Sequence, residues 1–191
     1  FHMMEQPRQG GFFLGKIATP VPCIYMNYEM HEADVQGILN EMEPNPEGET
    51  WSLILTPERP LDLRELRDFL LLQPKPGLIV IDCFRAAFAL SEGQENDSSV
   101  VGSKLRPLAA IARETGWVIL LIHHFNKAGT GEALDMAGSH EFLAASDLVM
   151  TWVCPNMLEP GKLRLTGRIP PHAEQLVLLS RESIEFLAAP T

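Results

Sequence analysis

The chain has 191 residues, of which 46% are hydrophobic and 21% are charged, so it is long enough to bury the core of one domain. Asp and Glu number 25 against 15 Lys and Arg, which gives a formal net charge of −10. A protein with this net negative charge does not attract nucleic acid or an anionic membrane through its overall electrostatics. Any contact with DNA must therefore depend on a local group of residues.

The cysteines are Cys23, Cys83 and Cys154, which lie far apart in the sequence. An odd number without a Cys-x-x-Cys pair argues against a disulfide framework and against a zinc site. No apolar run reaches the roughly 18 residues of a membrane span, and the first residues lack the pattern of a signal peptide. We therefore expect a cytoplasmic protein without membrane contact. Residues 1–3 resemble a remnant of a cloning site and are left out of the fold prediction.

Strand and helix patterns alternate along most of the chain. In chain order they predict a strand at 23–28, a helix at 32–42, a strand at 51–55, a helix at 62–73, a strand at 77–82, a helix that closes at Gly116, a strand at 117–122, a helix at 140–146 and a strand at 148–153. Asp62 and Glu65 form a capping pair at the start of the second helix. Pro107 either kinks the third helix or marks its start. The strands at 77–82 and 117–122 are apolar without alternation, as in strands that a parallel sheet buries on both faces.

The pattern changes after Gly161, where short strands are predicted at 162–166, 175–180 and 183–187. We interpret them as antiparallel additions on one edge of the sheet. The alternation before them predicts an α/β fold with right-handed crossovers. We therefore expect a single domain over 1–191, with an α/β core at 4–160 and antiparallel strands at 161–191.

Residues that can carry chemistry follow three of these strands: Glu29 after the first, Asp82 at the end of the third, and His123 with His124 after the fourth. In α/β sheets functional residues gather at the carboxyl ends of strands. We therefore expect Glu29, Asp82 and at least one histidine to line one cleft. An apolar strand that ends in Asp is typical of a Walker B motif, whose carboxylate holds Mg²⁺ beside nucleotide phosphates. Many buried strands end in Asp only to cap a turn, so Asp82 alone does not decide between the two roles.

Five short segments share their order and spacing with a known family; they lie at 24–30, 78–85, 95–97, 105–108 and 120–124. They resemble the hexameric replicative helicases of the plasmid RepA type and related AAA-type RecA-like ATPases. The resemblance implies a RecA-like three-layer sandwich with a mostly parallel sheet, and ATP and Mg²⁺ as the cofactors of the family. It also implies self-association or pairing with other ATPase subunits, and single-stranded DNA as a partner.

By this resemblance Glu29 corresponds to the carboxylate that activates the attacking water, and Asp82 to the carboxylate on the magnesium side. His123 and His124 correspond to the sensor end of the strand that detects the γ-phosphate. Because neighbouring residues on a strand point to opposite faces, we expect at most one histidine to face the site. An acid at the start of a helix is also favourable in a purely structural role, which is the alternative for Glu29.

The phosphate-binding loop of the family has no convincing counterpart in this sequence. Residues 10–16 have the spacing Gly-x4-Gly-Lys, but Ile17 replaces the hydroxyl residue that binds Mg²⁺, and Pro20 and Pro22 cannot open a phosphate-cradling helix. We therefore interpret residues 10–22 as the linker that follows the phosphate-binding helix in the family. The strand before that loop, which is internal in the family's sheet, is then missing. The strands that flank the missing strand would then have unpaired backbone groups. We expect self-association, pairing with residues 4–16 or closure of the gap to satisfy these groups.

The segment after the histidines corresponds to a mobile loop that reaches the ring centre or the neighbouring subunit in the family. Lys127 and Ser139 are its candidate contacts to nucleic acid or to that subunit. Where relatives have Arg-Gly-Ser, this chain has Ala137, so the arginine offered to the transferring phosphate is absent. Arg164 and Arg168 are candidate replacements.

Three hypotheses follow from these patterns. The first is a truncated or degenerate RecA-like ATPase or helicase core of DNA replication or recombination type, which binds ATP and Mg²⁺ weakly and does not hydrolyse ATP with these residues alone. The second is a non-enzymatic interaction or assembly module with the same fold, and nucleotide binding discriminates the two. The third, a metal-dependent hydrolase using His123, His124, Asp82 and Asp147, matches no familiar spacing of ligands.

Overall fold

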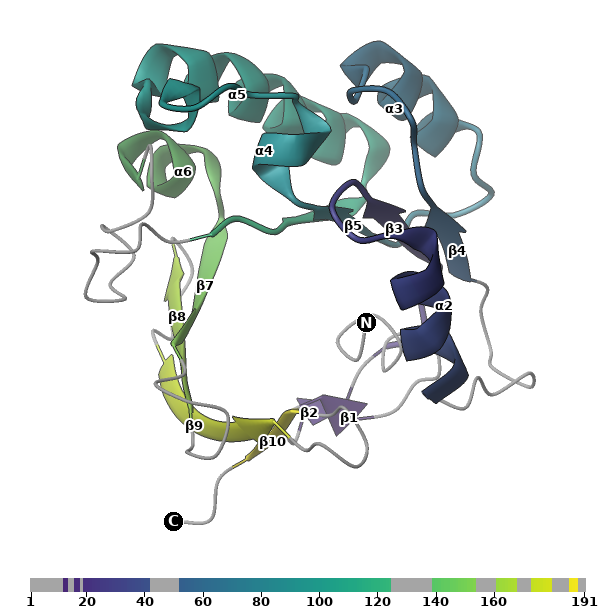
Figure 1. Ribbon diagram of the computed structural model, residues 1–191, viewed down its shortest axis with the longest axis vertical. Coiled ribbons are helices and arrows are strands. Elements are labelled where there is room, and N and C mark those ends of the chain that lie inside the picture. The colour runs from purple at the N-terminus through teal and green to yellow at the C-terminus, as the bar shows by residue number, and fades with distance from the viewer. Residues whose placement is uncertain are drawn as a thin grey trace. The chain divides into compact units, whose positions relative to one another are not determined.

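The computed structural model describes residues 12–13, 16–17, 19–41, 52–124, 139–153, 161–167, 173–179 and 186–188 (Figure 1). The chain divides into two compact units. The first unit comprises Phe1–Glu92 and Arg106–His123, and the second comprises Gly93–Leu105 and His124–Thr191.

The first unit contains a four-stranded parallel sheet in the order β4-β3-β5-β6. Its strands are β3 (Cys23–Asn27), β4 (Ser52–Leu55), β5 (Leu78–Asp82) and β6 (Val118–Leu121). The four strands predicted in this part of the chain are therefore confirmed. In the register of the central pair, Tyr25 lies opposite Val80 and Asn27 lies opposite Asp82.

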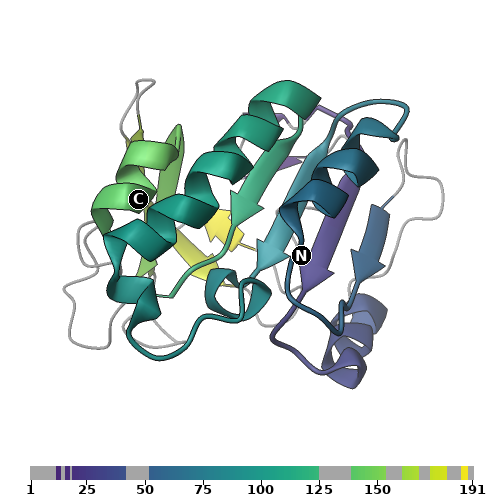
Figure 2. The same ribbon diagram turned by 90° about the horizontal axis from the view of Figure 1, so that it is seen from above.

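One face of this sheet is covered by helices. Ile24, Met26, Ile79 and Ile81 point to this face and pack against α3 (Leu63–Leu71), α4 (Phe84–Ala87) and the C-terminal half of α5 (Ser98–Thr115). Figure 2 shows α3 and this half of α5 side by side across the strands. The helix α2 (Glu32–Glu41) follows β3. The opposite face has its own buried cluster, formed by Cys23, Tyr25, Leu78 and Val80. Both faces of the central strands are thus buried, as their uninterrupted apolar sequences require.

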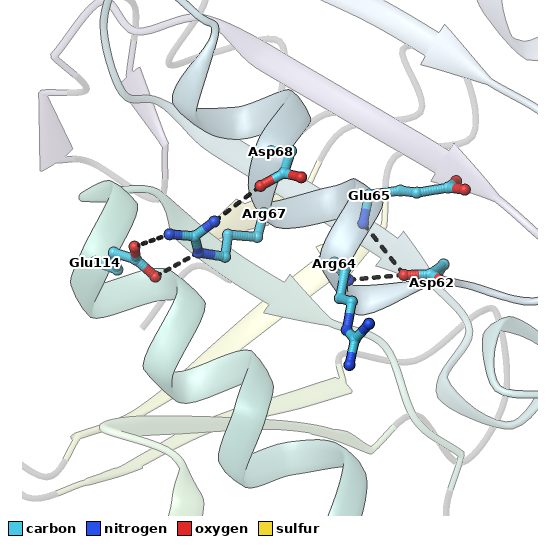
Figure 3. A network of polar contacts seen from close by, with 6 residues as sticks. All are labelled: Asp62, Arg64, Glu65, Arg67, Asp68 and Glu114. Carbon is cyan, nitrogen blue, oxygen red and sulfur yellow. Dashed lines mark hydrogen bonds and ion pairs between the residues drawn. The ribbon is translucent and has the colours of Figure 1, made fainter.

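The start of α3 shows how local sequence sets a helix boundary. The Asp62 carboxylate accepts hydrogen bonds from the backbone N–H groups of Arg64 at 2.8 Å and Glu65 at 3.2 Å (Figure 3). These bonds satisfy donors that the first turn leaves without a partner. The predicted cap is confirmed, but the Glu65 carboxylate pairs with Arg59 instead of completing a reciprocal capping box.

A single arginine links α3 to α5 on the surface. The Arg67 guanidinium donates from Nε to Glu114 Oε2 at 2.8 Å and from a second nitrogen to the other oxygen of that carboxylate (Figure 3). A third contact, at 2.8 Å, joins Arg67 to Asp68. Exposed ion pairs contribute little to the free energy of unfolding. This bidentate contact therefore acts mainly on the relative orientation of the two helices.

The helix α5 begins earlier than the position of its proline suggested. Asp97 accepts hydrogen bonds from the backbone N–H groups of Ser99 at 2.8 Å and Val100 at 3.3 Å, which caps the helix before Ser98. Pro107 lies inside the helix, so the alternative in which it marks the start is wrong. The helix ends before Gly116, whose φ of 75° is the left-handed conformation typical of this position.

The strand β6 is less buried than its apolar sequence predicted. Val118 is 63% exposed, and Ile119, Leu120 and Leu121 are half-buried. The cause is its place at the edge of the sheet, where only β5 pairs with it among the described residues. Val118 N donates to Gly77 O at 2.9 Å and Ile122 N to Ile81 O at 3.0 Å, so the backbone groups of the odd-numbered residues between them point away from β5.

The N-terminal segment does not pair with this open edge where it is described. Instead β1 (Phe12–Phe13) and β2 (Lys16–Ile17) form an antiparallel hairpin with each other. Of the three ways in which we expected the edge to be covered, pairing by residues 4–16 is thus not seen in the described part of that segment. Self-association and closure of the gap stay predictions.

The second unit contains α6 (Ser139–Ala145) and a four-stranded antiparallel sheet in the order β10-β9-β8-β7. Its strands are β7 (Leu148–Val153), β8 (Gly161–Gly167), β9 (Ala173–Leu179) and β10 (Phe186–Ala188). The predicted antiparallel C-terminal strands are confirmed. Among the described residues β7 pairs only with β8, and antiparallel, so the assignment of 148–153 to the parallel alternation stays a prediction. Parallel neighbours need a crossover of about a dozen or more residues, and Gly161 follows Val153 too soon for one.

None of the described helices is both long enough and apolar enough to cross a lipid bilayer.

The end of α3 offers a matched test of the core. Leu70 is 2% exposed and Leu72 is 82% exposed. We predict that Leu70→Ala lowers the free energy of unfolding by about 2–5 kcal/mol, because it leaves a cavity under the sheet. Leu72→Ala should change it by less than about 0.5 kcal/mol. Urea denaturation followed by circular dichroism measures both, and equal losses in the two variants would contradict the packing of α3 against the sheet.

Candidate active-site edge of the parallel sheet

The carboxyl ends of β3, β5 and β6 meet at one edge of the parallel sheet. Tyr28 N donates to Asp82 O at 2.6 Å, which continues the ladder past the end of β3, and Phe84 N donates to Ile122 O at 2.8 Å beyond β5. The residues that follow these strands are therefore brought together by backbone hydrogen bonds. Glu29, Asp82 and His123 all belong to these segments.

Asp82 is the last residue of β5 and is half-buried. Its side chain is on the face of the sheet opposite α3, α4 and α5, like that of Val80 two residues earlier. The hydroxyl group of Tyr25 donates a hydrogen bond to Asp82 Oδ2. Tyr25 is 2% exposed, so this bond satisfies a hydroxyl that has little access to water.

Glu29 lies in the bend between β3 and α2 and is exposed. The bend is held by Asn27, which is 3% exposed. The Asn27 side-chain oxygen accepts hydrogen bonds from Glu29 N at 3.3 Å and Met30 N at 2.9 Å, and its amide nitrogen donates to Met30 O at 2.7 Å. An asparagine that binds the backbone of the following residues imitates a tight turn. Asn27 therefore fixes the backbone that bears Glu29.

The carboxylate of Glu29 accepts a hydrogen bond from the thiol of Cys83. Cys83 is buried, and this burial, together with the hydrogen bond to Glu29 and the charge of that group, raises the pKa of its thiol. The thiol thus stays protonated and serves as a donor rather than as a nucleophile. Through this bond the carboxylate after β3 is tied to the residue directly after Asp82.

The two histidines after β6 have different surroundings. His123 is half-buried, and its ring meets the ring of Phe84 edge-on, with centroids 5.7 Å apart and planes inclined by 80°. Phe84 is fully buried, so His123 has a packing role whatever else it does. His124 is exposed. Whether Glu29, Asp82 and a histidine line one cleft stays a prediction.

Several predicted residues lie elsewhere or outside the described residues. Lys127, Ala137 and Arg168 are outside them, and Ser139 is the first residue of α6. Arg164 lies in β8, opposite Thr151 of β7, and is half-buried. Asp147, from the metal hypothesis, is exposed directly before β7.

The sequence Gly-x4-Gly-Lys at 10–16 does not end at the start of a helix. Lys16 and Ile17 are the two residues of β2, and the chain then runs through an irregular stretch at 19–22 into β3. A phosphate-binding loop needs backbone N–H groups that converge at the N-terminus of a helix. The local structure at Lys16 lacks that arrangement and is compatible with the linker interpretation.

Sequence reasoning missed Tyr25, Asn27 and the donor role of Cys83. The signal was present in β3, where Tyr25 and Asn27 interrupt an otherwise apolar run at alternate positions. Polar side chains at buried positions require partners. The partner of Tyr25 depends on the register between β3 and β5, which the pattern of one strand does not contain. The partners of Asn27 are backbone groups of the bend that follows β3.

Comparison with known proteins finds a family model and a solved structure that match this chain. A family model described as an AAA domain matches residues 4–130, well over half of the chain. Among solved structures, the fold is similar to that of a KaiC-like protein, PH0186, from the hyperthermophilic archaeon Pyrococcus horikoshii OT3. That match has a TM-score of 0.53 and 15% sequence identity, and it covers 90% of this chain and 76% of the other, so it concerns the fold alone. No curated protein matches the sequence significantly.

The only two tyrosines of the sequence provide a test of this edge. Burial first, and then the hydrogen bond and charge of Asp82, raise the pKa of Tyr25 above its ordinary value, and burial raises the pKa of Tyr28 to about 12. We predict that neither phenol ionises near pH ~10 in the folded, metal-free protein. Asp82→Asn should lower the pKa of Tyr25 but leave it raised, because burial is its largest cause.

The ultraviolet absorbance of tyrosinate follows this titration, with Asp34→Asn on the exposed face of α2 as the control. Because the folded state holds the phenolic protons more tightly than the unfolded state, the associated stability is fully present below pH ~10 and is lost as the pH rises. Ionisation near the ordinary pKa in a chain that is still folded would contradict the contact between Tyr25 and Asp82.

Proposed function

Because the chain belongs to the AAA-domain family of RecA-like ATPases, we propose that it is an ATPase core of DNA replication or recombination type, and that these 191 residues by themselves do not turn over ATP. The observation that supports this proposal is the arrangement of residues at the carboxyl ends of β3 and β5. Asp82 lies opposite Asn27, and Glu29 follows Asn27 by two residues. This arrangement offers two carboxylates of different burial at the ends of adjacent strands.

The donor set at Asp82 fits a magnesium ion. Mg²⁺ prefers hard oxygen ligands and keeps several water molecules, so one half-buried carboxylate at a sheet edge is a suitable contact. Tyr25 occupies Oδ2, and no described residue bonds Oδ1. Bound there, Mg²⁺ would neutralise charge on the phosphates of ATP. Asp82 would hold it, directly or through water.

Glu29 has the properties of a residue that orients water. It is exposed, and Asn27 fixes its backbone. An in-line attack on phosphorus needs an acceptor that holds the attacking water. The hydrogen bond from Cys83 competes for the same carboxylate, so Glu29 would have to exchange this thiol for water before it could act.

Binding of the ATP phosphates is the function for which this chain offers the fewest suitable groups. Lys16 lies in a strand, and the described residues around it form no turn into a helix. The absence of an arginine at Ala137 would lower the rate of transfer further, unless Arg164 or Arg168 replaces it. We therefore expect ATP and Mg²⁺, the cofactors of the family, to bind weakly to this chain.

We further propose that both units belong to one RecA-like domain, since the similar archaeal fold extends over 90% of the chain. One of His123 and His124 would sense the γ-phosphate, and Lys127 and Ser139 would contact DNA or a neighbouring subunit. With a net charge of −10, a contact with single-stranded DNA would depend on such local residues. Self-association or pairing with other ATPase subunits follows from the same family.

The second candidate is a non-enzymatic interaction or assembly module. The strand conformation of Lys16 favours it, because a module of this kind needs no phosphate-binding turn. Both candidates share the fold and differ in whether Asp82 contacts a nucleotide-bound cation.

Calorimetric titration with a non-hydrolysable ATP analogue and Mg²⁺, beside a phosphate-release assay, tests the proposal. Charge-assisted hydrogen bonds contribute roughly 1.5–3 kcal/mol each, so the loss of three should weaken binding by about a thousandfold or more. We predict only weak binding and no phosphate release in the wild type. Lys16→Ala should leave the binding unchanged, whereas Asp82→Asn should abolish its dependence on Mg²⁺.

Micromolar binding that Lys16→Ala removes would make residues 10–17 a divergent phosphate-binding loop and would contradict the proposal of weak binding. An absence of binding in every variant, even at millimolar nucleotide, would favour the interaction module.

A further inference from the structure

Tyr25 is a buried side chain with one polar atom. On the face of the sheet opposite α3, α4 and α5 it lies in a cluster with Cys23, Leu78 and Val80, and it is 2% exposed. A buried phenol usually needs a partner for its hydroxyl group, and here the partner is a carboxylate oxygen of Asp82.

The register of the strands explains this contact. Tyr25 lies opposite Val80, while Asp82 is two residues further along β5 on the same face. The phenol therefore reaches along the sheet toward its carboxyl edge. Its ring is packed on a rigid strand and has only two side-chain torsions, so its hydroxyl group has little freedom of position. A hydrogen bond from such a donor fixes the rotation of the carboxylate that accepts it.

We propose that Tyr25 is a positioning residue that orients Asp82 for a divalent cation, with Oδ2 bound to the phenol and Oδ1 left to the cation or its water. This inference rests on the proposed function, in which Asp82 is the carboxylate on the magnesium side. Groups that hydrogen-bond to a metal ligand orient it, and their removal commonly weakens metal binding by an order of magnitude or more.

The probe is Mn²⁺ alone, added to the full chain, with the free ion measured by electron paramagnetic resonance. The variants are Tyr25→Phe, Asp82→Asn, the double variant, and Tyr28→Phe as the matched control at the other tyrosine. We expect a site in the wild type that Asp82→Asn removes and that Tyr25→Phe weakens about tenfold. Tyr28→Phe should bind like the wild type, and the double variant should bind like Asp82→Asn, since the phenol acts only through that carboxylate.

Two results would overturn the inference and are distinguishable. If Asp82→Asn loses the site while Tyr25→Phe binds like the wild type, the positioning role is wrong and the role of Asp82 stands. If Asp82→Asn binds like the wild type, the magnesium role of Asp82 in the proposed function fails as well.

A second measurement keeps the test decisive if Tyr25→Phe does not fold. In the Tyr28→Phe variant, 3-fluorotyrosine labels Tyr25 alone. Mg²⁺ should shift its fluorine resonance with a midpoint that competes with Mn²⁺, because the cation and the phenol share one carboxylate. A resonance that does not move over that range would contradict the proposal.

Discussion

The parallel register between β3 and β5 is the constraint on which the rest of the candidate site depends. A single backbone hydrogen bond, from Tyr28 N to Asp82 O, carries this register to the edge of the sheet. Since the side-chain period of a strand is two, a slip of one residue would turn Asp82 to the opposite face and separate it from Tyr25. The apolar residues on both faces oppose such a slip, because each would have to leave one buried cluster for the other.

Buried polar groups then convert this register into a particular arrangement of carboxylates. In a low-dielectric interior an unsatisfied hydroxyl or amide is costly, so Tyr25 and Asn27 must keep their hydrogen bonds. Tyr25 meets this demand at Asp82, and Asn27 meets it at the bend that bears Glu29. The protonated thiol of Cys83 adds a link between the two segments. The positions of Glu29 and Asp82 are thus set by residues whose burial also stabilises the sheet.

The sequence predicted the elements better than their pairing. Apolar runs that end on polar residues located β3 and β5, and Asp62 located the start of α3, because these signals are local. Among the described residues β7 pairs only with β8, and β6 lies at the edge of the parallel sheet despite its apolar residues, because strand partners depend on distant segments. The order of strands pointed to Glu29 and Asp82, whereas Tyr25, whose hydroxyl group acts across the register, was missed. Asn27, whose side chain holds the bend after its own strand, was missed as well.

Nuclear magnetic resonance tests most directly whether β3 and β5 hold Glu29 and Asp82 at one edge of the sheet. Scalar coupling through a hydrogen bond joins an amide nitrogen to the carbonyl carbon that accepts its proton. We predict such a coupling between Tyr28 N and the carbonyl carbon of Asp82, beside the one between Ile122 N and that of Ile81. A coupling from Tyr28 to any other carbonyl, with the pair at Ile122 and Ile81 still present, would contradict the shared edge.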